Sequence, residues 1–146
     1  MDAILRNVTY NNPDIKSEIN RLVGKSYPFS QRLKMKGTGS PKYLISGASN
    51  LFMEKLMLDN NLNYINIEIR PGGIIVFFRS LLETFGWIIP FNMLEIKKKD
   101  KNFELRSGMD FMIFENNLKY NSAEKFLDKI LDYKDHFNNQ KSEKNA

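Results

Sequence analysis

The stretch 64–79, YINIEIRPGGIIVFFR, decides the fold that this sequence predicts. Isoleucines at 65, 67 and 69 alternate with other residues, so they share one face of a strand whose opposite face is in water. Pro71 and Gly72 take the second and third positions of the turn 70–73, which predicts a type II turn. The apolar run 74–78 then returns as a buried strand. Together these signals predict a β-hairpin.

Short apolar segments continue the pattern downstream. A turn near 81–83 leads into a strand that ends at Pro90, and Pro90 indicates an edge or a bend because it has no N–H to donate. Further strands are expected at 94–96, around 103–105 and at 110–115. Strands over about 64–115, joined by short turns, predict a small bent antiparallel sheet.

A helix is predicted before the strands, over 13–23. Asn12 can cap it, and Pro13 fits the first helical position, where no backbone donor is needed. Apolar residues recur at helical spacing until Gly24 supplies a stop.

A second helix is predicted at the end of the chain, over about 122–137. Asn121 and Glu124 stand three apart as in a capping box, and an apolar stripe at helical spacing follows. The polar residues 138–146 are expected to form a disordered tail.

Two segments before the hairpin give weaker signals. Apolar and cationic residues alternate over 33–36 and glycines follow at 37 and 39, which predicts a short strand that enters a loop. The apolar residues between 43 and 59 fit neither the helical nor the strand period, so both structures stay open there.

The chain has 146 residues, which predicts one domain over 1–137. Its 42% apolar and 27% charged residues are typical of a globular protein. The absence of cysteine excludes a disulfide scaffold, a thiolate metal site and a cysteine nucleophile, and a single histidine excludes a multi-histidine metal site. We therefore predict no cofactor and no bound metal.

The stretch from Ile65 to Tyr133 resembles uncharacterised small bacterial proteins with a pleckstrin-homology-like barrel. The pieces 67–73 and 87–91, IEIRPGG and WIIPF, carry the likeness, which covers about half of the chain. The resemblance implies an α+β fold, a small bent antiparallel sheet or barrel closed by the C-terminal helix. The N-terminal helix 13–23 departs from that pattern. The resemblance implies no catalytic residues.

Positive charge is concentrated in the first third of the chain. Residues 1–53 contain eight Lys or Arg against three Asp or Glu, whereas residues 54–146 contain fourteen of each. Between positions 19 and 53 there is no acid at all. Such a stretch suits an anionic partner. The candidate binding residues are Lys25, Arg32, Lys34, Lys36 and Lys42.

These features favour a non-catalytic binding or scaffold module that contacts an anionic protein or membrane surface through the basic segment. Nucleic-acid binding through the same residues is the alternative. An enzyme that uses carboxylates is less favoured, because the carboxylates lie on separate predicted elements and His136 lies near the end of the last helix. A solvated lysine-rich surface with no ligand is the plainest interpretation of the charge.

The apolar run 72–94 is interrupted by Arg79, Glu83 and Pro90, so a transmembrane segment is not expected. The first ten residues lack the long apolar run of an export signal. A cytoplasmic location, including the periphery of the membrane, is therefore expected.

Overall fold

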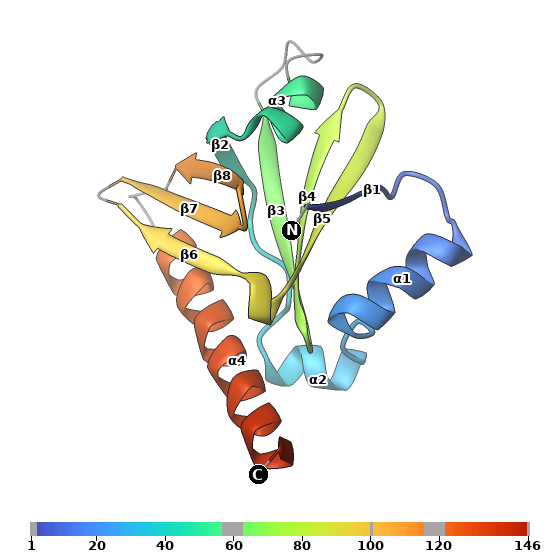
Figure 1. The fold of residues 1–146 in the computed structure, drawn as a ribbon, viewed down its shortest axis with the longest axis vertical. Helices are drawn as coiled ribbons and strands as arrows, with labels where there is room; N and C mark the ends of the chain where they lie inside the picture. The colour runs from blue at the N-terminus through green and yellow to red at the C-terminus, as the bar shows by residue number, and fades with distance from the viewer. Residues whose placement is uncertain (1–2, 57–62, 100, 116–121, 146) are drawn as a thin grey trace.

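The computed structural model describes residues 3–56, 63–99, 101–115 and 122–145, and it confirms an α+β fold (Figure 1). Strands and helices alternate in its first part, strands dominate the middle, and a long helix ends it. The elements are β1 Ile4–Asn7, α1 Pro13–Val23, α2 Phe29–Lys34, β2 Tyr43–Ala48, α3 Asn50–Leu56, β3 Tyr64–Arg70, β4 Gly73–Ser80, β5 Glu83–Pro90, the short 3-10 turn η1 Phe91–Met93, β6 Glu95–Lys98, β7 Asn102–Ser107, β8 Asp110–Glu115 and α4 Ser122–Asn145.

The strands form one antiparallel sheet of eight in the order β1-β5-β4-β3-β2-β8-β7-β6. Strand β2 joins two parts of it, because Tyr43 and Leu44 pair with β3 whereas Ile45 to Ala48 pair with β8. A bulge between Ile45 and Gly47 marks the change of partner, and such bulges bend a strand. Figure 1 shows the result, since β6, β7 and β8 run across the direction of β3, β4 and β5.

The sheet is bent but not closed into a barrel. Strands β1 and β6 are its two edges, and each pairs with one neighbour. Both edge strands have only four residues. On β6, Lys98 pairs with Asp128 of α4 at 2.6 Å, so this edge carries charge, which discourages further strand pairing. The sequence predicted a bent antiparallel sheet or barrel, and the structure contains the bent sheet in an open form.

The concave side of the sheet holds the main core, and α4 packs into it. The isoleucines at 65, 67 and 69 are fully buried there, as their alternation predicted, together with Trp87. Helix α4 contributes Phe126, Leu127 and Ile130. The predicted C-terminal helix is therefore confirmed, and its apolar stripe has the expected partner.

The predicted end of that helix at Phe137, with a disordered tail after it, is wrong, because α4 continues to Asn145. Residues 138–141 are exposed, so burial does not hold this extension in place. Its Gln, Lys and Glu residues have good intrinsic helix propensity, which lets an existing helix propagate into solvent.

Helix α1 packs on the opposite side of the sheet. Asn12 accepts hydrogen bonds from the backbone N–H groups of Asp14 and Ile15, so the predicted N-cap and helix 13–23 are confirmed. Ile19 and Val23 form a second apolar cluster with residues of β4 and β5.

The turn after β3 exists, but the predicted type is wrong. Gly72 does not have the positive φ that a type II turn requires at its third position. The absence of a side chain allows a close approach there instead, because a Cβ on Gly72 would lie 3.3 Å from the carbonyl oxygen of Val23, which is a tight contact. The Gly72 N–H donates to that same oxygen at 2.8 Å.

Three further segments differ from the sequence prediction. The prediction of a strand over 33–36 is wrong, because residues 33 and 34 belong to the helix α2, which ends there. The open segment 43–59 contains both a strand, β2, and a helix, α3, and its last residues 57–59 lie outside the described ranges. Strand β1 was not predicted, because its partner β5 lies about eighty residues away.

Candidate anion-binding face

The face of β3, β4 and β5 that points away from the main core is called the outer face below. Alternation along β3 puts Glu68 and Arg70 on this face, opposite the buried isoleucines. Three hollows lie along it, each lined in part by cations of the basic segment.

The α1 hollow, of about 770 Å³, lies between α1 and the outer face. Its apolar lining includes Ile75 and Phe77 of β4. The charged residues among its described lining are Lys16, Lys25 and Arg70, all of them cationic. The hollow therefore combines an apolar floor with a positive rim.

Arg70 is largely occupied by contacts within the protein. Its Nε donates to Glu68 Oε2 at 2.6 Å, and its Nη1 donates to Gly24 O at 2.9 Å and to Asn20 Oδ1 at 3.2 Å. The Arg70 side chain is 14% exposed. Arg70 therefore holds the end of α1 against β3 and offers little charge to a ligand.

The α2 hollow, of about 480 Å³, is lined by Phe29, Arg32, Leu33 and Lys36 together with residues 37–39 and Glu68. Phe29 is 69% exposed and Leu33 is 64% exposed, one helical turn apart on α2. Glu68 is the one acid among the described lining residues, and Arg70 already neutralises it. Exposed apolar side chains and unopposed cations thus share one short helix.

The hairpin hollow, of about 390 Å³, lies beside the turn between β4 and β5. Tyr64, Phe77, Leu81 and Leu82 contribute apolar surface to it. The cations Lys42 and Arg79 also line it, with no acid among the described lining residues.

The structure brings only part of the predicted binding set together. Arg32 and Lys36 line the same hollow, whereas Lys25 lines the α1 hollow and Lys42 the hairpin hollow. Lys34 is exposed on α2 and lines none of these three. The five residues are therefore divided among three hollows and one further exposed position, and they do not form one compact site.

Sequence reasoning missed Lys16, Arg70 and Arg79 as members of this face. The alternation over 64–69, continued by one residue into the predicted turn, is the signal that would have placed Arg70 on the outward face. Nothing local in the sequence showed that α1 would lie on the same face, since that depends on tertiary packing.

Lys129 of α4 fixes the end of α2. Its Nζ donates to the carbonyl oxygen of Gly37 at 2.6 Å and also to that of Met35. Burial lowers the pKa of Lys129, and the nearby Lys36 charge lowers it further. The Lys129 amine and the buried side chain of Met35 together tie the C-terminal end of α2 to the core.

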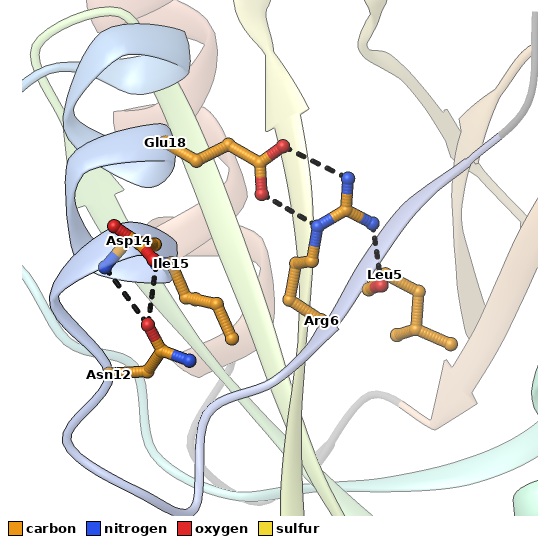
Figure 2. A network of polar contacts seen from close by, with 6 residues as sticks. All are labelled: Leu5, Arg6, Asn12, Asp14, Ile15 and Glu18. Carbon is orange, nitrogen blue, oxygen red and sulfur yellow. Dashed lines mark hydrogen bonds and ion pairs between the residues drawn. The ribbon is translucent and has the colours of Figure 1, made fainter.

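An ion pair holds α1 to the edge of the sheet (Figure 2). Arg6 Nε and Nη2 donate to the two carboxylate oxygens of Glu18 at 2.6 and 3.0 Å, and Arg6 Nη1 donates to the Leu5 carbonyl at 2.9 Å. The hydrogen bond from Arg6 lowers the pKa of Glu18, and the same bond raises the pKa of Arg6. This pair is a structural tie, with both partners satisfied by each other.

In the described ranges no group of three His, Asp or Glu side chains gathers where a metal ion could bind. His136 is exposed, with its ring nitrogen 3.0 Å from the Gln140 amide on the next turn of α4.

None of the helices in the described ranges is both long and apolar enough to cross a bilayer. Comparison of the chain with protein-family models, with curated proteins and with solved structures gave no match.

Proposed function

We propose that this protein is a non-catalytic binding module that docks on an anionic membrane surface through α2. One observation carries the proposal: Phe29 and Leu33 are 69% and 64% exposed, one turn apart, on a helix that also presents Arg32 and Lys34. Neither residue belongs to a core cluster, so packing in the core does not account for this exposed apolar pair.

The combination of side chains fits a membrane interface better than a purely ionic partner. Each Lys or Arg close to an anionic leaflet contributes about 1 kcal/mol, and burial of a large apolar side chain contributes about 1.5–3 kcal/mol. Arg32, Lys34 and Lys36 supply the first contribution, and Phe29 and Leu33 supply the second. Phosphate backbones of nucleic acids would use the cations but leave Leu33 without a partner.

Helix α2 is also held rigidly enough to act as a docking element. The Lys129 amine binds carbonyl groups at its C-terminal end, while Gly39 and Ser40 just beyond it pair with β3. An element fixed before binding loses less conformational entropy on binding.

The test is co-sedimentation with phosphatidylcholine vesicles, with and without phosphatidylserine, at about 0.05 M and about 0.5 M salt. Two variants probe the helix: an apolar α2 variant, Phe29→Ser with Leu33→Ser, and a charge α2 variant, Arg32→Gln with Lys34→Gln and Lys36→Gln. The matched controls remove two exposed leucines (Leu81→Ser with Leu82→Ser) or three exposed lysines (Lys97→Gln, Lys99→Gln and Lys101→Gln) from elsewhere.

We expect binding only when phosphatidylserine is present, with the charge α2 variant weaker on the order of 100-fold and the apolar α2 variant weaker by at least about tenfold. Both controls should bind as the unaltered chain does. Equal loss in the controls would contradict the proposal, as would no binding to either vesicle.

Nucleic-acid binding is the second outcome that the experiment separates. A gel-shift assay with duplex DNA, run on the same variants, should show no stable complex. A complex that weakens steeply with salt and is unaffected in the apolar α2 variant would replace the membrane proposal.

We also propose that the protein is located at the cytoplasmic periphery of the membrane and that its fold is similar to that of pleckstrin-homology-like domains. The open bent sheet with α4 packed in its concave side supports that likeness. The added helix α1 and the unpaired edges β1 and β6 depart from a closed barrel.

A further inference from the structure

Two leucines at the turn between β4 and β5 are exposed to solvent. Leu81 is 57% exposed and Leu82 is 85% exposed, and they form the two-residue loop between the paired residues Ser80 and Glu83. Loop residues in this position are ordinarily polar or glycine. Neither leucine belongs to a core cluster, so packing does not explain them.

The backbone makes the choice of leucine at 81 more unusual. Leu81 has φ +57°, in the left-handed region that glycine and asparagine adopt readily and a bulky side chain adopts at a cost. Two-residue hairpin loops that need such a φ normally use glycine, asparagine or aspartate there. An exposed apolar side chain thus occupies a backbone conformation that is costly for it.

The hairpin hollow adjoins these leucines and gives the surface its chemistry. Its wall includes Tyr64, 44% exposed, and Phe77, and the charged residues among its described lining are Lys42 and Arg79. The nearest acid in sequence, Glu83, alternates to the other side of β5 and accepts a hydrogen bond from the Asn7 side chain. The surface is thus apolar with positive charge at its rim.

We propose that this surface, the hairpin hollow with Leu81 and Leu82, docks an acidic protein segment that carries a bulky apolar side chain. Such a side chain would fill the hollow against the leucines while carboxylates meet Lys42 and Arg79. Charge complementarity argues against a second copy of this chain, because the same cations would face each other. The choice of a protein over a membrane rests on the proposed function: when α2 contacts the membrane, this turn points away from it, because α2 and the turn lie at opposite ends of the molecule in Figure 1.

This inference goes beyond the proposed function, since it adds a protein-docking surface that α2 leaves accessible. The protein would then hold an acidic partner at one end while α2 contacts an anionic surface at the other.

The test is selection of a phage-displayed random peptide library on the immobilised full chain, followed by fluorescence anisotropy with the enriched peptides. A hairpin variant, Leu81→Asn with Leu82→Ser, and a rim variant, Lys42→Gln with Arg79→Gln, are compared with the unaltered chain. The apolar α2 variant is the matched control, because it removes two exposed apolar side chains from the other end. Circular dichroism verifies that each variant is folded.

We expect enrichment of peptides that combine Asp or Glu with Leu, Phe or Trp, and at least about tenfold weaker binding by the hairpin and rim variants. The control should bind as the unaltered chain does. Peptides without this pattern, or equal binding by the hairpin variant, would overturn the proposal. Loss of vesicle binding in the hairpin variant would overturn it too, whereas failure of the α2 variants to lose vesicle binding concerns only the proposed function.

Discussion

At the scale of single residues, several side chains serve contacts that their local sequence does not reveal. Arg70 looks like a solvated strand residue, yet it donates to Glu68, Asn20 and Gly24. Tyr43 lies in a segment whose local sequence favours neither helix nor strand, and its hydroxyl is buried with no hydrogen-bond partner among the described residues. These cases lead to predictions that single substitutions can check.

Tyr43→Phe should leave the free energy of unfolding at neutral pH unchanged or raise it by up to about 1 kcal/mol, because an unpaired buried hydroxyl is removed. Burial raises the pKa of Tyr43 to about 12, from an ordinary value of 10. The unfolded chain therefore ionises first, and the stability present below pH 10 is lost as the pH rises toward 12. The variant should lose less over that interval.

Urea denaturation at about pH 8 and about pH 11 measures both effects. Tyr64→Phe is the matched control, because Tyr64 is 44% exposed. A loss of more than about 2 kcal/mol at pH 8 would show that the Tyr43 hydroxyl is hydrogen-bonded after all.

Leu81→Asn should raise the free energy of unfolding by about 0.5–1 kcal/mol, because asparagine adopts the left-handed conformation at lower cost. Leu82→Asn is the control and should change little, since Leu82 does not have a positive φ. Thermal unfolding of both variants provides the comparison. Destabilisation by Leu81→Asn would indicate that the leucine is retained for folding, which would weaken the case for a docking role.

At the scale of elements, the position of α2 depends on a side chain from the far end of the chain. A six-residue helix is not stable alone, and α2 has no side-chain N-cap. The Lys129 amine instead binds the carbonyl groups that follow it. The proposed membrane contact therefore depends on α4 as well as on α2.

Lys129→Met should destabilise the protein by about 1.5–3 kcal/mol, because the Met35 and Gly37 carbonyls lose a charged donor. Hydrogen exchange should increase most in residues 34–39. Lys125→Met, an exposed lysine one turn earlier on α4, is the control and should alter neither quantity. Unchanged exchange in 34–39 would contradict the anchoring role.

The elements that local sequence signals determine were predicted from the sequence, whereas the elements that depend on distant partners were not. Helix α1, the hairpin of β3 and β4, and the core stripe of α4 follow from caps, alternation and helical spacing within each segment. Strand β1, helix α2 and the open sheet do not, because each depends on partners far along the chain. The basic segment was visible in the sequence, but its division among three hollows depends on where α1 and α2 pack.

At the scale of the whole molecule, the outer face has two ends that differ in chemistry. At the α2 end, cations lie beside the exposed apolar side chains of a helix. At the hairpin end, cations lie beside a turn with an apolar residue at a positive φ. We therefore expect only the α2 end to enter the membrane interface.

The most direct measurement uses the absence of cysteine in this chain, which allows one nitroxide label at a chosen position. Ser30→Cys places the label on α2, and Leu82→Cys places it at the hairpin turn. On phosphatidylserine-containing vesicles, the label at position 30 should become more accessible to oxygen and less accessible to a polar nickel chelate, while the label at position 82 should stay exposed to the chelate. Full exposure to the chelate at position 30 would contradict the claim that α2 enters the membrane interface. Protection from the chelate at position 82 and not at position 30 would contradict it as well.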